Sequence, residues 1–139
     1  MAAFFKHHGK FPAAIQEYFR ARWDKQYLWT LDLPVFPLKT SELEWHLAYP
    51  FWSTSPPKPL FDLRPRAVLS SPSEYPVHWD RVLSADLAYP IATAIFGDRL
   101  VILDGLHRLV HAIYRQHAEV DHVVIPRNMF QSPSRYPQR

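Results

Sequence analysis

The stretch Leu100-Val101-Ile102-Leu103-Asp104-Gly105-Leu106-His107-Arg108 decides the fold of this chain. Its first four residues are apolar and typical of a buried strand, and a helical pattern follows Gly105 as far as His117. A strand that turns on a glycine into a helix leaves backbone N–H groups without partners at the helix start. Those donors and the positive end of the helix dipole favour an anion. The stretch therefore predicts a phosphate site.

The residues on either side of this turn extend the pattern into a β-hairpin, a helix and a last strand. The predicted order is strand Ile91–Phe96, turn Gly97-Asp98, strand Arg99–Leu103, helix Gly105–His117 and strand Val120–Ile125. A glycine followed by an aspartate between two apolar runs is a two-residue hairpin signal. We therefore expect a mixed α+β (α/β) fold, a small twisted mixed sheet with flanking helices, in one domain over residues 1–139.

The rest of the chain predicts further elements around that core, which we place over about 28–126. They are a helix over 11–25, a strand Leu28–Phe36, a short helix from Ser41, a strand Ala67–Leu69 and a helix His78–Leu87. The proline-rich residues 49–66 predict an ordered loop that its aromatic and leucine side chains pin to the body. The arginine-rich tail, residues 127–139, is expected to be frayed or draped on the surface.

Composition excludes several classes of protein. The chain has 139 residues, 47% of them hydrophobic, so it can build a core of ordinary domain size. It has no cysteine, which rules out disulfides, thiolate metal sites and cysteine nucleophiles. No signal peptide and no apolar run of membrane-spanning length is visible, so we expect a cytoplasmic protein without a membrane partner.

The helix after the glycine carries two faces. Leu106, Leu109, Val110 and Ile113 share one side and are expected to pack on the hairpin, while His107, Arg108, His111 and Arg115 share the other. Arg108 would offer a forked cation suited to phosphate oxygens, and His107 a titratable donor. The alternative is a solvated basic face with no ligand.

The order of hairpin, Asp-Gly turn and His-Arg pair resembles the ParB/sulfiredoxin superfamily. The residues that carry the resemblance are Tyr89-Pro90-Ile91, the run Val101–Leu109, Ala112 and Val123-Val124-Ile125. It implies that Gly105, the Leu106 N–H, His107 and Arg108 hold the phosphates of ATP or another nucleotide, with Mg. Asp104 would orient Arg108 or help to hold the Mg ion, and turn formation is its alternative role.

Three branches of that superfamily differ at this motif. Sulfiredoxins have a catalytic cysteine where this chain has Leu106, so sulfiredoxin chemistry is excluded. ParB proteins continue into a helix-turn-helix DNA reader, for which the sequence after Pro126 is too short. The Asp-Gly-Leu-His-Arg turn is most similar to the Asp-Gly-His-His-Arg turn of free serine kinases. That branch uses an upstream glutamate as base, for which Glu42 and Glu44 are the candidates, and helix capping is the alternative for Glu44.

Other side chains were weighed for the same site. His78, Asp86 and His111 are candidates for contacting a substrate or a base, with a surface salt bridge or cap as the alternative for His78 and Asp86. A metal held by His107, His111 and Asp104 is disfavoured because the cation Arg108 lies between the two histidines in sequence. The aromatic residues Trp45, Tyr49, Phe51 and Trp52 stack on a base, wall a pocket or anchor the proline-rich loop.

These observations predict a nucleotide-binding protein that is a kinase-like phosphotransferase or a nucleoside triphosphate hydrolase. Its partners would be a nucleotide and a small-molecule or protein acceptor. One alternative is a non-catalytic module that binds a nucleotide or a protein. The other is a nucleic-acid binder or nuclease, which the mild formal net charge of +3 does not favour.

Overall fold

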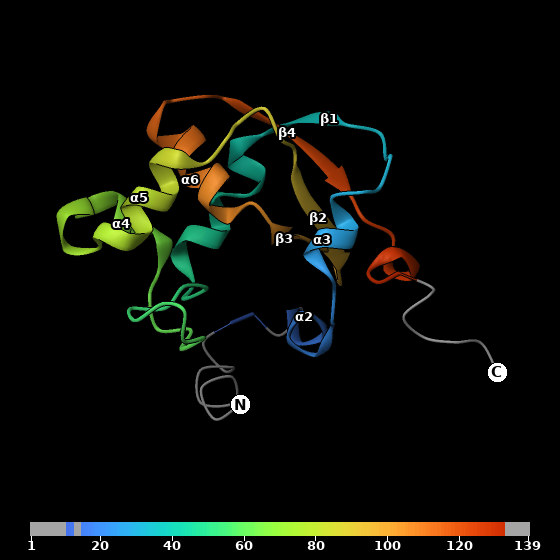
Figure 1. Cartoon of the computed structure of the whole chain (residues 1–139), viewed down its shortest axis with the longest axis horizontal. Helices are drawn as coiled ribbons and strands as arrows, with labels where there is room; N and C mark the ends of the chain where they lie inside the picture. The colour runs from blue at the N-terminus through green and yellow to red at the C-terminus, as the bar shows by residue number, and fades with distance from the viewer. Residues whose placement is uncertain (1–10, 13–14, 133–139) are drawn as a thin grey trace.

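The computed structural model of the chain describes residues 11–12 and 15–132. A four-stranded mixed sheet lies at its centre, in the order β1-β4-β2-β3, which confirms the mixed α+β fold (Figure 1). The strands are β1 Phe36–Lys39, β2 Ile91–Phe96, β3 Arg99–Asp104 and β4 Glu119–Val124. β2 runs antiparallel to β3 and parallel to β4, and β1 pairs antiparallel with β4 at the edge.

The predicted hairpin is confirmed, and both faces of its sheet are covered. Phe96 pairs with Arg99, so Gly97 and Asp98 form a two-residue turn. Side chains alternate between the faces, as the period of a strand requires. Ala92, Ala94, Phe96, Val101 and Leu103 belong to one core cluster, whereas Ile91 and Ile102 belong to another on the side of the helix that follows β3.

The helices lie on both sides of this sheet. They are α2 Gln16–Arg20, α3 Lys25–Leu28, α4 Pro65–Ser70, α5 Pro76–Ser84 and α6 Leu106–Tyr114, with short 3-10 helices at Thr40–Glu42, Glu44–Ala48, Pro72–Glu74 and Arg127–Met129. Figure 1 shows α4, α5 and α6 together on one side and α2 and α3 on the other. As predicted, Leu109 and Ile113 of α6 pack against the hairpin residues Ile91 and Ile102. Val110, expected on the same face, instead packs with Val68 of α4 and Val82 of α5.

The predicted strand Leu28–Phe36 is wrong. Asp24 caps α3, because its side chain accepts hydrogen bonds from the backbone N–H groups of Gln26 and Tyr27. Leu28 ends that helix with a buried side chain, and β1 begins only at Phe36. Of the helix predicted over 11–25, the described residues form only α2, and α3 begins at the predicted end of that helix. Residues 13–14 lie outside the described part of the chain.

The predicted strand Ala67–Leu69 is also wrong, because these residues lie in α4. Pro65 occupies the first turn of that helix, where its missing N–H costs nothing. Pro76 starts α5 in the same way, so this helix runs Pro76–Ser84 instead of the predicted His78–Leu87. The helix expected from Ser41 is a pair of 3-10 helices, and no side chain caps either of them.

The tail is draped over the body as far as the structure describes it. Arg127 forms an ion pair with Glu17 and places its guanidinium carbon 4.2 Å from the centre of the Phe96 ring. Phe130 is buried and packs edge-on against Trp23. Residues 133–139 lie outside the described residues. Within the described part of the chain, every helix is too short or too polar to cross a bilayer.

Candidate functional site

Gly105 makes the turn between β3 and α6, in a left-handed conformation with φ +118°. A Cβ atom at this position would lie 3.1 Å from Nη1 of Arg108 and 3.2 Å from Cγ1 of Ile91. Both the backbone angle and the close packing therefore require glycine. The turn predicted from the sequence is present, and it fixes where the first residues of α6 point.

The substitution Gly105→Ala is expected to lower the free energy of unfolding by about 2 kcal/mol. Alanine is strained at this φ, and its methyl group would press on Ile91 and Arg108. Urea unfolding followed by tryptophan fluorescence measures the loss. Gly97→Ala is the matched control, because Gly97 also has a positive φ of 61° but lies in the exposed hairpin turn. An effect at Gly105 no larger than that at Gly97 would contradict the crowding.

The first turn of α6 leaves backbone donors open. The N–H of Leu109 donates to the carbonyl of Gly105 at 3.0 Å, the first bond of the helix. The preceding N–H groups, those of Leu106, His107 and Arg108, have no acceptor among residues 11–12 and 15–132. Together with the helix dipole they make this end of α6 electropositive.

A cavity of about 220 Å³ opens at this helix start. It is lined by Gly105, Leu106 and His107 of the turn and by Lys25 and Tyr18 of the N-terminal segment, among others. The side chain of Lys25 is 58% exposed, and its Nζ lies 3.8 Å from Oδ1 of Asp104. Burial raises the pKa of Tyr18, so its hydroxyl stays protonated, and it makes no hydrogen bond with the described residues. Lys25 therefore adds a cation to the lining of this cavity, and Tyr18 adds a hydroxyl that can donate a hydrogen bond.

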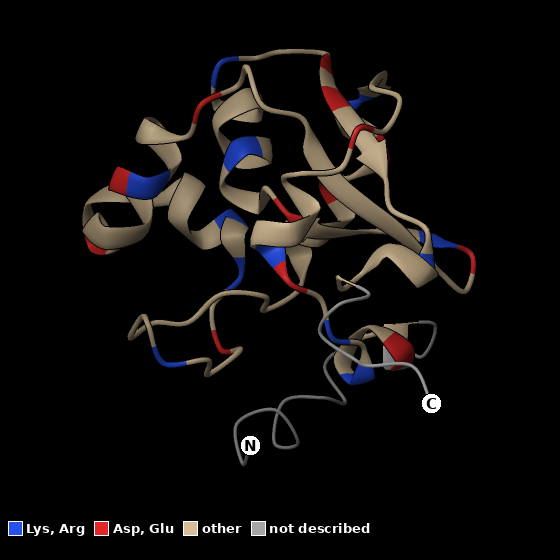
Figure 2. Cartoon of the chain, turned by 45° about the vertical axis from the view of Figure 1, so that its right-hand side comes forward, with Lys and Arg blue, Asp and Glu red and all other residues tan. Residues whose placement is uncertain are grey.

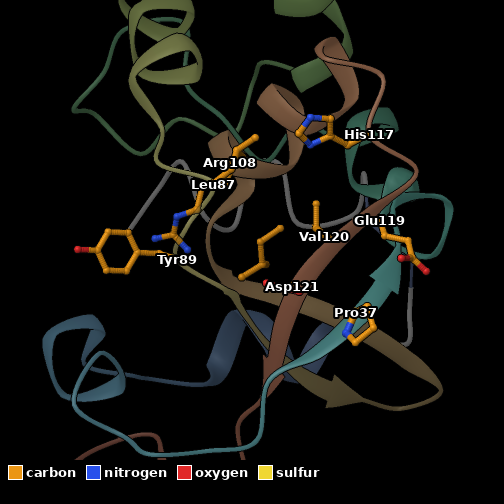
Figure 3. Close-up of a pocket in the computed structure, with 9 residues that line it drawn as sticks. Pro37, Leu87, Tyr89, Arg108, His117, Glu119, Val120 and Asp121 are labelled. Atoms are coloured by element: carbon orange, nitrogen blue, oxygen red, sulfur yellow. The ribbon is translucent and has the colours of Figure 1, made fainter.

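Arg108 points to a different place from the one that the resemblance implies. Its Nη1 donates to the carbonyl of Pro90 at 2.7 Å, and its Nη2 donates to Oδ2 of Asp104 at 3.2 Å. The guanidinium lines two neighbouring cavities, of about 310 and 560 Å³, and not the one at the helix start. Figure 3 shows the smaller of them, with Arg108 beside Tyr89 and Leu87. Arg108 therefore holds the turn in place and does not face the open amides.

Asp104 orients Arg108, as one of its predicted roles requires. Oδ2 also accepts a hydrogen bond from the indole Nε1–H of Trp29 at 2.8 Å, and Lys25 lies near Oδ1. A carboxylate that already faces these donors fits poorly as a Mg ligand. In the part of the chain that the structure describes, no group of three or more His, Asp or Glu side chains could hold a metal ion.

His107 and His78 form a hydrogen-bonded pair on the face of Trp52. Nδ1 of His78 lies 3.2 Å from Nε2 of His107, and the two rings are parallel to the Trp52 indole within 9° and 13°. Nε2 of His78 lies 2.7 Å from the carbonyl oxygen of Ser53, which can only accept, so this nitrogen carries a proton. In a neutral His78, Nδ1 is then an acceptor, and Nε2–H of His107 must donate to it.

The hydrogen bonds from Ser53 through His78 to His107 determine which ring nitrogen of His107 is left for a ligand. Its Nδ1 keeps a lone pair and has no partner among the residues described, and the ring lines the cavity. Burial first, and then His78 and nearby cations, lower the pKa of His107 to about 3. His107 is therefore neutral at pH 7 and accepts a hydrogen bond, instead of acting as the titratable donor that its position predicts.

The other predicted site residues do not reach this cavity. The basic face expected on α6 is wrong at His111, which is 8% exposed and places Nδ1 2.9 Å from the carbonyl oxygen of Ala85. Asp86 is exposed and accepts a hydrogen bond from the N–H of Ala88, in keeping with a local cap. Glu42 and Glu44 are exposed, line none of the three cavities around the turn and cap no helix with their side chains.

Trp45 packs within the protein, whereas Phe51 and Trp52 line the cavity at the start of α6. Trp45 stacks on His46 with ring centres 3.9 Å apart, and the guanidinium of Arg99 lies over the Trp45 ring.

No family model matches the chain, and neither a curated protein nor a solved structure matches it. The resemblance to the ParB/sulfiredoxin superfamily therefore stays a prediction that rests on the residues of the hairpin and the turn.

Proposed function

We propose that the cavity at the start of α6 binds the phosphate end of a nucleotide. The observation that carries the proposal is the set of open N–H groups at Leu106, His107 and Arg108, beside a cavity that also holds Lys25 and Tyr18. Phosphate oxygens are acceptors that such backbone donors suit. Arg108 pairs with Asp104 outside this cavity, so Lys25 is the cation that lines it and attracts an anion.

The size of the cavity limits what enters it. Pockets for whole cofactors have volumes of roughly 300–1,000 Å³, whereas this one has about 220 Å³. The volume suits one or two phosphate groups, with the nucleoside lying outside. ATP and ADP are therefore the first ligands to test. Both are tested with and without Mg²⁺, because the carboxylate of Asp104 already accepts hydrogen bonds from Trp29 and Arg108.

Phosphoryl transfer is the second candidate, and His107 is the observation that favours it. Its free Nδ1 would accept a hydrogen bond from a water or from the hydroxyl of an acceptor beside the phosphate. A base works best when its pKa lies near the working pH, and the pKa of His107 is about 3. We therefore favour nucleotide binding over a kinase or hydrolase activity.

Nucleic-acid binding is a weaker alternative. Figure 2 shows Lys and Arg positions interspersed with Asp and Glu positions along the described ribbon. Two of the arginines expected on that surface are engaged within the described part of the chain: Arg115 donates to His111, and Arg127 pairs with Glu17. Salt-dependent retention on DNA or RNA remains the observation that would support this alternative.

Calorimetric titration with pyrophosphate, ADP and ATP tests the proposal. We expect the wild-type protein to bind all three and the variants Lys25→Met and Tyr18→Phe each to weaken binding by about tenfold, the loss of one charged hydrogen bond. Lys58→Met is the control, because Lys58 is exposed and lies in the proline-rich loop. Absence of binding by the wild-type protein, or equal losses in Lys25→Met and Lys58→Met, would reject the site. Release of phosphate from ATP decides between binding and turnover.

A further inference from the structure

The largest of the three cavities around the Asp104 turn is separate from the phosphate cavity. It has a volume of about 560 Å³ and lies where residues 28–35 face the start of β2. Asp104 lines both cavities, and its contacts with Lys25 and Trp29 lie between them. Its volume falls in the range of small-molecule sites, which is roughly 300–1,000 Å³.

The wall of this cavity is apolar, and its aromatic side chains are left in water. Most of the lining is contributed by leucine, valine, alanine, proline and aromatic residues. Trp29 and Tyr89 both line it, yet they are 64% and 65% exposed, and Val35 is 50% exposed. A planar ring that covers Trp29 and Tyr89 would remove this apolar surface from water.

The charged side chains that line the cavity indicate whether its ligand is a cation or an anion. Two carboxylates line it, Asp32 and Asp104, against one cation, Arg108. Arg108 is committed to Asp104 and to the carbonyl of Pro90. Asp32 is exposed and makes no hydrogen bond or ion pair with any residue that the structure describes. The excess negative charge at Asp32, next to the aromatic rings, favours a cation.

We propose that this cavity, which we call the aromatic cavity, is a binding site for a small aromatic cation, a planar ring carrying an amine or amidine. The ring lies against Trp29 and Tyr89, and the charged nitrogen faces Asp32. An anion is disfavoured in this cavity because the carboxylate of Asp32 would repel it, and the one lining cation, Arg108, is already paired with Asp104. The aromatic cavity therefore takes a ligand of the opposite charge to the phosphate cavity, and its test does not depend on nucleotide binding.

A pair of indole probes with opposite charge tests this site. Tryptamine and indole-3-propionate share the ring and differ in the charge at the end of a short chain. In an NMR titration of the ¹⁵N-labelled protein we expect tryptamine to shift the Trp29 Nε1–H and the amides of Asp32 and Tyr89. Indole-3-propionate should bind at least about tenfold more weakly. Equal affinity for the two probes, or no binding of tryptamine, would overturn the proposal.

Variants of exposed residues separate the site from folding. Asp32→Asn should weaken tryptamine by about fivefold, the worth of one exposed ion pair, and Tyr89→Leu should weaken both probes. Asp98→Asn is the control, because Asp98 is an exposed aspartate in the hairpin turn. Pyrophosphate should not displace tryptamine. Displacement of tryptamine, or an unchanged affinity in Asp32→Asn, would place the probe elsewhere and contradict the assignment.

Discussion

Lowering the pH from 7 to 4 is expected to remove about 3 kcal/mol of folding free energy through His46 alone. His46 is 0% exposed, its Nδ1–H donates to the carbonyl of Leu43, and its Nε2 accepts from the N–H of Ile102. Burial lowers the pKa of His46 from 6.5 to about 4. The unfolded chain therefore takes up a proton below pH 6.5 that the folded chain refuses until about pH 4. His107 and His78 act in the same direction.

Urea unfolding at a series of pH values measures this loss. The variant His46→Gln keeps a donor and an acceptor but cannot be charged. We expect it to be about 1 kcal/mol less stable at pH 7 and to lose correspondingly less between pH 6.5 and 4. His117→Gln removes an exposed imidazole and is the control. The account of His46 is wrong if His46→Gln and the wild-type protein have the same pH dependence.

Arg108→Met is expected to cost about 3 kcal/mol of stability, whether or not a ligand is present. The side chains of Arg108 and Asp104 are only 17% and 14% exposed, so the loss of the guanidinium leaves a mostly buried carboxylate. The carbonyl of Pro90 also loses its donor. Thermal and urea unfolding measure the effect. A binding assay on this variant alone would therefore confuse folding with recognition, which is why Lys25 and Tyr18 are the better probes.

A double-mutant cycle with Asp104→Asn separates the ion pair from the rest of that cost. Asparagine keeps an acceptor for Trp29 and removes the charge. We expect a coupling energy of about 1–2 kcal/mol between Arg108→Met and Asp104→Asn. Additive effects would mean that Arg108 stabilises the turn through Pro90 alone.

The hairpin and the start of α6 could be predicted because their signals are local. The continuous apolar runs, the Gly97-Asp98 turn and Gly105 each act within a few residues of the chain. The strand expected at Leu28–Phe36 failed because a competing local signal, the cap at Asp24, starts α3 instead. Pro65 and Pro76 are also local signals, because proline favours the first turn of a helix, and they mark the starts of α4 and α5. The apolar residues that follow each proline suggested other elements or bounds.

The candidate site could be predicted only in part, because half of it is assembled from distant segments. Gly105, Leu106 and His107 share one cavity as expected, but no local pattern brings Lys25 and Tyr18 to it. The direction of Arg108 depends on the Pro90 carbonyl, and the state of His107 depends on His78. A sequence names the residue types at a turn, whereas packing decides which way each side chain faces.

The most direct test of the phosphate cavity is an NMR titration of the ¹⁵N-labelled protein with pyrophosphate. The account predicts that the backbone amides of Leu106, His107 and Arg108 shift together and saturate with one affinity, while the Trp29 indole N–H moves little. Shifts spread over the exposed lysines and arginines, with these three amides unmoved, would contradict an anion site at the start of α6.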